Sequence, residues 1–420
     1  MHRERELSAT VGVILASATF AAVGGCLTVP GTLLPVLVDA FRIRLVEAGS
    51  MFALQATAYV LSVASAGPII QRCGMRAVLS VGMLGFAAGF AGFGVVSTWW
   101  GGATMLFISG LGFGVVEVAL DTLLIVLGGA RRANLLNLSQ FFFAVGAFVG
   151  PAAAARVVAG GVSWRAVFGA AGGLAAAVAL AWALRPIGDA ARVDDSPAQT
   201  ETTSLRSKLS IVMALMMAAY VGAEMGIGGW LSKYMVEIRR VDLSYAGTTV
   251  SLYWMGIAAG RLVLTATSHY MNEQRLLLGL TIGAAAAFAF GLATQQPALA
   301  VAAFAVTGFS FSGIFPGIIA LAGRYHPQNV AGITSVVVTG AGLGGIIIPW
   351  VMSAVADGFG LVAGMGFYLL MCGLMIVLAV AINVLGPAAG DRSELPGSAA
   401  LGASTMPQPP HVHGNSNISG

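Results

Sequence analysis

Three acidic residues, Glu117, Asp121 and Glu224, lie inside long apolar stretches of the sequence. An acid at the centre of a bilayer-spanning helix costs about 2.5–3.5 kcal/mol on insertion scales, so acids at that depth usually serve a function. Carboxylates there can carry protons or accept hydrogen bonds from a polar substrate. The three acids therefore indicate a proton-coupling site in a membrane transporter.

The spacing of the acids adds to this interpretation. Glu117 and Asp121 are four residues apart, so both project from one face of a helix. Two acids this close disfavour joint ionisation, and the pair can hold and release a proton. The alternative is that one acid stays protonated and bonds a neighbouring helix, with no role in transport. The same two readings apply to Glu224, where a broken or closely approached helix is permitted by Gly222, Gly226, Gly228 and Gly229.

Aromatic residues near Glu224 are candidate substrate ligands. Trp230 and Tyr234 share one helix face, whereas Trp230 lies about 240° around the helix from Glu224. A bend at Gly228-Gly229 would bring Trp230 and Glu224 to one ligand, as an aromatic platform and a hydrogen-bond acceptor suited to a sugar. The alternative is a tryptophan anchored at the membrane interface.

Two amides at span depth, Gln140 and Asn137, are either further substrate ligands or hydrogen-bonding contacts between helices. The three cysteines are scattered and predict neither a disulfide nor a metal site. We expect no cofactor, and no nucleotide-binding motif indicates ATP-driven pumping. The basic pI reflects loop arginines rather than a nucleic-acid surface, and we expect no enzymatic activity.

Composition identifies the elements that must position these residues. Hydrophobic residues make up 57% and charged residues 9% of the 420, and the mean hydropathy is +0.87. This is typical of an all-α polytopic membrane protein, because a span needs about 20 apolar residues. Twelve such stretches occur, near 10–38, 48–71, 77–97, 101–128, 134–159, 164–185, 208–236, 244–268, 275–294, 297–322, 332–356 and 361–386.

The spans form two predicted bundles of six, 1–185 and 208–386. A Pro-, Ser- and Thr-containing stretch at 186–207 predicts a cytoplasmic linker, and 387–420 a disordered cytoplasmic tail. Most of the 21 Lys and Arg residues lie on the same side of the membrane as the predicted linker. Arg261, at the inner end of the eighth span, is counted among them. This bias predicts an integral plasma (inner) membrane protein with both termini cytoplasmic. We expect a monomer in the lipid bilayer.

An internal repeat relates the bundles. An offset of 198 residues superposes matching residues in the first, fourth and fifth spans on the seventh, tenth and eleventh. The pairs include Val23 and Val221, Gly24 and Gly222, Gly31 and Gly229, Leu33 and Leu231, Gly110 and Gly308, Phe113 and Phe311, Gly146 and Gly344, and Pro151 and Pro349. Two parallel repeats with a polar site between them are typical of secondary transporters that work by alternating access.

Several segments resemble the major facilitator superfamily. The stretch from Gly67 through Arg72 and Gly74 to Arg76 is similar to its signature gating loop between the second and third helices, although Gln71 and Met75 replace a usual acid and a usual basic residue. The fucose-permease-like sugar transporters of that superfamily are more similar still, over nearly all of 10–386. The matching segments are 110–124, 136–140 with 150–151, 220–234, 260–261 and 308–316.

The resemblance implies a twelve-helix transporter of a small polar solute, most often a sugar or polyol, by proton symport. Three departures affect coupling: the first span has no acid, Asp121 replaces a usual Asn, and Gln140 replaces a usual His. The 198 offset pairs Cys26 with Glu224. We therefore expect proton coupling through Glu117, Asp121 or Glu224. The alternatives are an exporter of a drug-like compound or secondary metabolite by proton antiport, and a non-transporting sensor or lipid-handling protein.

Overall fold

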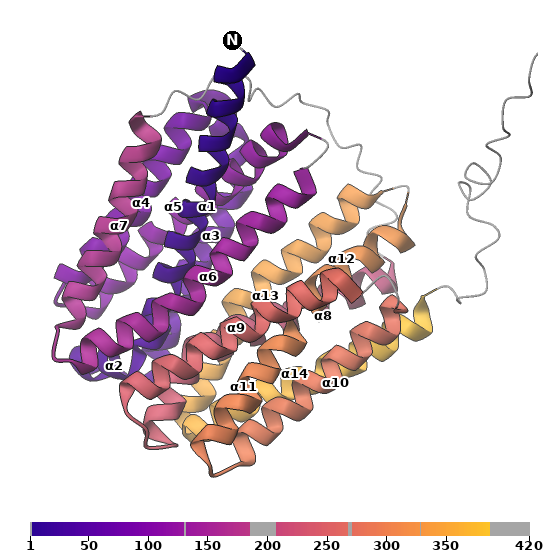
Figure 1. The fold of residues 1–420 in the computed structure, drawn as a ribbon. Coiled ribbons are helices and arrows are strands. Elements are labelled where there is room, and N and C mark those ends of the chain that lie inside the picture. Colours follow the sequence, from indigo (N-terminus) through magenta and orange to yellow (C-terminus); the bar gives the residue numbers. More distant parts are fainter. Residues whose placement is uncertain (1, 130–131, 185–206, 268–270, 328, 387–420) are drawn as a thin grey trace, which may run out of the picture.

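The computed structural model describes residues 2–129, 132–184, 207–267, 271–327 and 329–386. Every regular element in these ranges is a helix (Figure 1). The helices are α1 (His2–Thr32), α2 (Leu34–Phe41), α3 (Leu45–Cys73), α4 (Met75–Val95), α5 (Trp99–Gly128), α6 (Arg132–Ala159), α7 (Trp164–Leu184), α8 (Lys208–Glu237), α9 (Leu243–Thr267), α10 (Glu273–Ala293), α11 (Pro297–Phe311), α12 (Ile314–Tyr325), α13 (Val330–Phe359) and α14 (Leu361–Leu385).

Twelve membrane spans were predicted, and within the described ranges twelve helical stretches are long and apolar enough to cross a membrane. Two expected spans are divided. The first ends at Thr32, and α2 begins at Leu34 with Pro35 in its first turn. The tenth is split between α11 and α12, just before Pro316. Proline has no backbone N–H and destabilises a helix beyond its first turn, and both breaks lie within a few residues of a proline. Pro68, Pro151 and Pro349 nevertheless lie inside continuous helices.

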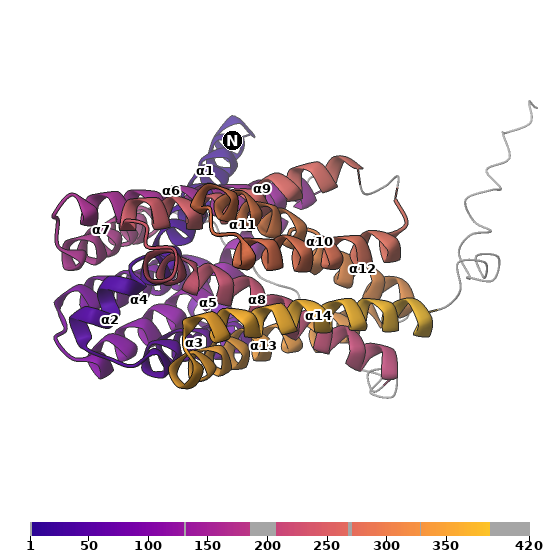
Figure 2. The same ribbon diagram turned by 90° about the horizontal axis from the view of Figure 1, so that it is seen from below.

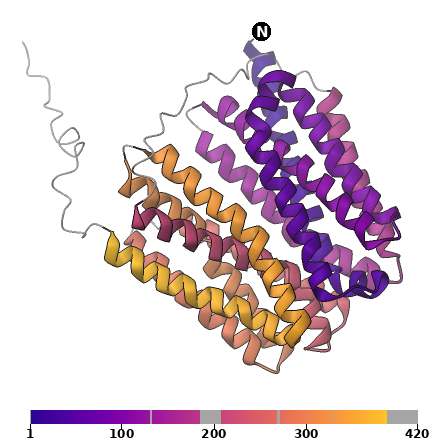
Figure 3. The same cartoon turned by 180° about the vertical axis from the view of Figure 1, so that it is seen from behind.

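The helices form two groups, α1 to α7 and α8 to α14 (Figures 1 and 3). Each group has its own core of buried apolar side chains, with Phe86, Phe90 and Trp182 in the first and Trp230, Tyr253 and Tyr368 in the second. The predicted linker at 186–207 lies outside the described residues except for Ser207, which caps α8, and the predicted tail at 387–420 lies outside them. The division into domains at the linker therefore stays a prediction.

Contacts inside the two groups repeat with the predicted offset of 198 residues. Gly110 on α5 packs against the backbone of Gln55 on α3, and Gly308 on α11 packs against the backbone of Tyr253 on α9. Gly308 follows Gly110 by 198 residues, and Tyr253 follows Gln55 by the same number. Glycine is needed at these crossings because a Cβ atom would collide with the neighbouring backbone. The structure thus has two pseudo-symmetric halves, as predicted.

The halves meet mainly at one side of the molecule. We call the side that carries the N-terminus the N side and the opposite one the far side, which Figure 2 views directly. The helices of the two halves converge toward the far side and diverge toward the N side (Figures 1 and 3). At the far side, Ser232 of α8 donates a hydrogen bond to the Thr32 carbonyl (2.6 Å), and Asp357 of α13 accepts one from the Leu45 amide (3.0 Å). We call these contacts the far-side seam.

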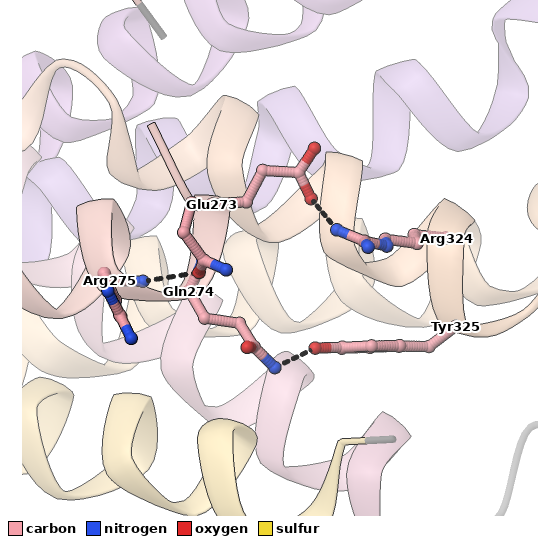
Figure 4. A network of polar contacts seen from close by, with 6 residues as sticks. Glu273, Gln274, Arg275, Arg324 and Tyr325 are labelled. Carbon is pink, nitrogen blue, oxygen red and sulfur yellow. Dashed lines mark hydrogen bonds and ion pairs between the residues drawn. The ribbon is translucent and has the colours of Figure 1, made fainter. Parts of the chain in front are cut away.

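A polar network on the N side ties α10 to α12 within the second half (Figure 4). Arg324 pairs with Glu273 at 3.2 Å, and the Gln274 amide donates to the Tyr325 hydroxyl. The guanidinium of Arg275 lies apart from this pair, and only its backbone amide bonds, to Asn272. The network fixes helix ends inside one half and makes no bridge to the other.

Candidate functional site

The acid Glu117 lies on α5 and faces α3. The Tyr59 hydroxyl donates a hydrogen bond to its Oε2 at 2.6 Å. The Tyr59 ring stacks on Phe113, one turn before Glu117, with ring centroids 5.0 Å apart. The carboxylate is therefore held by a rigid aromatic neighbour on an adjacent helix. This partner is 58 residues away in the sequence, and sequence reasoning missed it.

The second acid of the pair, Asp121, lies one turn further along α5. Its Oδ1 is buried and has no hydrogen-bond partner. Asp121 is close enough to act electrostatically on Glu117, as the four-residue spacing predicts. The structure thus brings together Tyr59, Glu117 and Asp121 as one polar cluster in the first half. The role of these acids in proton coupling stays a prediction.

The third acid, Glu224, lies in the middle of α8 and is 4% exposed. Tyr220, one turn earlier on the same face, is fully buried. The Tyr253 hydroxyl of α9 donates to the backbone carbonyl of Glu224 at 2.9 Å, which fixes the helix at this point. The Oε1 atom of Glu224 and the hydroxyl of Tyr220 are both buried without a hydrogen-bond partner. Unpartnered buried polar atoms are costly, and they commonly mark a site for water or a ligand.

Arg261 of α9 completes this second cluster. It acts electrostatically on both Tyr220 and Glu224, although no ion pair joins Arg261 to Glu224 among the described residues. Arg261 was counted with the basic residues of the cytoplasmic side. It lies within the helix Leu243–Thr267, toward its C-terminal end, and its charge acts on Tyr220 and Glu224 of α8. An arginine inside an apolar stretch is a sequence signal as strong as an acid there, and it could have identified this residue.

A crevice of about 80 Å³ lies between α6 of the first half and α9 of the second. Its polar lining comes from Asn137 and Gln140 on α6 and from Arg261 and Thr265 on α9. The structure therefore brings both predicted amide ligands to a boundary between the halves. Its apolar lining consists of Phe141, Ala144, Ala258 and Leu262.

The break at Gly228-Gly229 that would let Trp230 and Glu224 reach one ligand is absent from α8 in this conformation. The roles of both residues as substrate ligands stay predictions. The helix is continuous from Lys208 to Glu237. Its glycines serve close packing instead, since Gly226 lies against the Tyr368 side chain and Gly228 against the ring of Trp254. Without a bend, Trp230 and Glu224 keep their different directions.

The aromatic pair lies in the core of the second half. Trp230 is fully buried, which is not the position of a lipid-facing interface anchor. The Tyr234 hydroxyl bonds the Leu292 carbonyl at 3.5 Å, and its ring lies under the guanidinium of Arg239. These contacts indicate a packing role for Tyr234 in this conformation.

The predicted gating loop is very short. Gly67 and Arg72 belong to α3, and Gly74 alone separates α3 from α4. Gly74 has φ of +80°, a backbone conformation that favours glycine. Arg76 donates to the carbonyl of Ala183 at the end of α7. In this conformation Arg76 therefore links α4 to α7 within the first half. The role of the loop in gating stays a prediction.

The comparisons with known proteins agree with this architecture. The family model described as Major Facilitator Superfamily matches residues 15–335. Protein TsgA of Escherichia coli O9:H4 is 23% identical over 308 residues, which cover 72% of this chain and 77% of that protein. A Protein TsgA homolog of Erwinia tasmaniensis is 24% identical over 221 residues, which are 51% of this chain and 55% of that relative, so this match spans about half of its length.

Solved structures share the fold. The xylose transporter XylE from E. coli, in an inward open conformation, gives a TM-score of 0.71 at 14% identity, covering 91% of this chain and 98% of that one. The nucleoside transporter NupG gives 0.71 at 14% identity, with coverage of 90% and 98%. The E. coli fucose:proton symporter FucP gives 0.58 at 19% identity, with coverage of 89% and 99%.

Proposed function

This chain belongs to the major facilitator superfamily, and on that premise we propose that it is a secondary transporter that moves a small polar solute, a sugar or polyol, by proton-coupled alternating access. Its family and fold are those of transporters rather than enzymes. The observation that carries the proposal is the crevice between the halves, whose lining combines two amides on α6 with Arg261 and Thr265 on α9 and four apolar side chains.

Alternating access needs a seam that can open and close. The far-side seam consists of small residues and a few hydrogen bonds, and Gly31 of α1 there approaches the backbone of Gly229 of α8. These two glycines are related by the 198-residue repeat, so the contact lies where the two halves are equivalent. Such a contact suits two halves that rock about their common interface.

The solute class is supported by the chemistry of the crevice. Amide and hydroxyl groups of Gln140, Asn137 and Thr265 can both donate and accept hydrogen bonds, as a polyhydroxylated solute requires. Structures with the same fold are named as transporters of xylose, fucose and nucleosides. A second candidate is a proton-driven exporter of a drug-like compound, which the exposed apolar side chains of Phe141 and Leu262 at the crevice favour.

Proton coupling is proposed to use Glu117 and Asp121 in the first half and Glu224 in the second. The Tyr59 hydroxyl donates to Glu117, and this bond is stronger when Glu117 is ionised, so protonation of Glu117 would weaken the link between α5 and α3. We place the protein in the plasma membrane as a monomer, with both termini and the N side facing the cytoplasm. The far-side seam then closes the outer side.

The first experiment screens purified full-length protein against hexoses, polyols, nucleosides and drug-like cations by thermal shift, because a ligand of the folded state raises Tm with the logarithm of its concentration. We expect hexoses or polyols to stabilise. Stabilisation by drug-like cations alone would favour the exporter and overturn the proposed solute class.

The second experiment tests proton coupling in proteoliposomes. We expect Glu117→Gln to abolish uphill accumulation driven by a pH gradient and to leave solute exchange measurable, because the amide still hydrogen bonds but releases no proton. Asp121→Asn in the same helix is the matched comparison and should be milder, since related transporters resemble one another in an Asn there. Undiminished uphill uptake by Glu117→Gln would rule out this residue as the carrier.

A further inference from the structure

The crevice between α6 and α9 carries a positive charge. Arg261 is the charged residue among its eight lining residues, and none of them is acidic. The other polar side chains are two amides and a hydroxyl, which carry no charge. A neutral sugar needs hydrogen bonds but no full positive charge, so the arginine indicates an additional chemical requirement of the solute.

An acid of α8, Glu224, lies next to the guanidinium. Glu224 lies near enough to act on it electrostatically, yet no ion pair within 4.0 Å joins the two in the described part of the chain. Two buried oxygens beside it, Oε1 of Glu224 and the hydroxyl of Tyr220, have no hydrogen-bond partner. Both side chains are more than nine-tenths buried, at 4% and 0% exposure. Glu224 and Tyr220 do not line the crevice themselves. They lie next to Arg261, where their oxygens can form further hydrogen bonds.

The chemistry of arginine indicates which group of a ligand would bind Arg261. A cation at membrane depth is costly unless an anion or strong acceptors surround it, and the planar fork of arginine matches a carboxylate with two parallel hydrogen bonds. One positive charge balances one negative charge. A dianionic phosphate would bring a second negative charge close to Glu224, which opposes it.

We propose that the crevice binds the carboxylate of a small polyhydroxylated monoanion, a sugar acid, through Arg261, while Asn137 and Gln140 of the other half bond its hydroxyls. This deepens and rests on the proposed transport of a small polar solute. Because the ligand joins α6 to α9, its binding also draws the two halves together on the N side. Glu224 is then the internal competitor for Arg261 when the crevice is empty.

The test compares three ligands that share one ring: glucose, glucuronate and glucose 6-phosphate. Purified full-length protein is titrated with each at constant ionic strength, by thermal shift and then by calorimetry. We expect glucuronate to bind about 10-fold or more tightly than glucose, which corresponds to one hydrogen-bonded charge pair. Glucose 6-phosphate should bind more weakly than glucuronate.

Variants separate the charge of Arg261 from general effects. Arg261→Gln should abolish the preference for glucuronate over glucose, and Arg261→Lys should retain part of it, since lysine keeps the charge but not the fork. Arg275→Gln removes the same charge from an exposed position on the N side and should leave the preference unchanged. Glu224→Gln should increase the preference for glucuronate, because it removes the neighbouring negative charge.

The results distinguish this inference from the function on which it rests. Equal or tighter binding of glucose by the wild-type protein overturns the carboxylate site and leaves the sugar transporter standing. Retention of the glucuronate preference by a folded Arg261→Gln protein also overturns it. Binding of none of the three ligands overturns both the inference and the proposed solute class. Should Arg261→Gln fail to fold, the wild-type preference and Arg261→Lys decide the question.

Discussion

The contact between Gly31 and Gly229 offers a direct test of alternating access. It joins α1 of the first half to α8 of the second in the far-side seam, next to the hydrogen bond from Ser232 to Thr32. A Cβ atom added at Gly31 would lie 2.7 Å from the Cα of Gly229 and 2.9 Å from its carbonyl oxygen. Gly31→Ala therefore inserts a wedge between the two halves where backbone faces backbone.

The size of the effect follows from this overlap. Separations below 3.0 Å do not occur for real Cβ atoms, so α1 and α8 must move apart. Overpacking of one methyl group typically costs about 1–3 kcal/mol. Each half can keep its own core if the seam opens, so this cost falls on the closed seam. The equilibrium should shift roughly 5- to 150-fold toward the state that is open on the far side.

Thiol labelling measures that shift. Cys26 and Cys372 are buried and Cys73 is exposed, so a Cys73→Ser background is nearly silent to a membrane-impermeant maleimide. Ser232→Cys then reports on the seam, because Ser232 is fully buried while the seam is closed. We expect Gly31→Ala to raise its labelling rate from the far side and to slow solute exchange.

The matched control is Gly173→Ala on α7, where an added Cβ meets nothing within 4 Å. It should leave both labelling and transport unchanged. If Gly31→Ala labels at the wild-type rate while remaining folded, the seam does not govern access from the far side. A fall in Tm without any change in labelling would mean that the contact is merely structural.

Three further predictions concern charged and titratable groups. Asp357→Asn should raise far-side labelling no more than about 5-fold, because its pair with Arg44 at 3.7 Å is exposed and such pairs are worth at most about 1 kcal/mol; a larger rise would contradict this. Tyr59→Phe should lower pH-driven uptake in proteoliposomes roughly 10-fold, since Glu117 loses its charge-assisted bond; equal uptake would refute it. Burial lowers the pKa of His326, so stability is complete above its ordinary pKa of 6.5 and is lost as the pH falls. His326→Gln should flatten the fall in Tm between about pH 7 and pH 5, and an unchanged slope would exclude this residue as its source.

Much of the fold could be predicted because a membrane restricts the choice of structure. Helix lengths follow from apolar stretches, since every backbone N–H and C=O in lipid must be bonded within the segment. The repeat was visible because glycines such as Gly110 and Gly308 recur at crossings where no other side chain fits. The breaks after Thr32 and Phe311 were missed, although prolines three and five residues later marked both.

The site was less predictable because its residues meet across helices. The depth of Glu117 and Glu224 could be predicted from composition, but the partner of Glu117 is Tyr59 on another helix. Glycines near Glu224 suggested a bend, and the same residues instead admit Tyr368 and Trp254. A glycine permits both outcomes, and only the neighbouring helix decides between them.

The two halves pack alike, but their acidic side chains lie at different positions. Glu224 is paired by the repeat with Cys26, which is 3% exposed and points its thiol at the Ala171 carbonyl at 3.7 Å. The acids deep within the spans of the first half lie instead on α5, at Glu117 and Asp121. Rocking motions can therefore be nearly symmetric between the two halves, whereas the proposed proton and solute sites are not. Substitutions in the seam should change the distribution between open states without altering selectivity, whereas substitutions of the acids should change coupling and leave the closed seam intact.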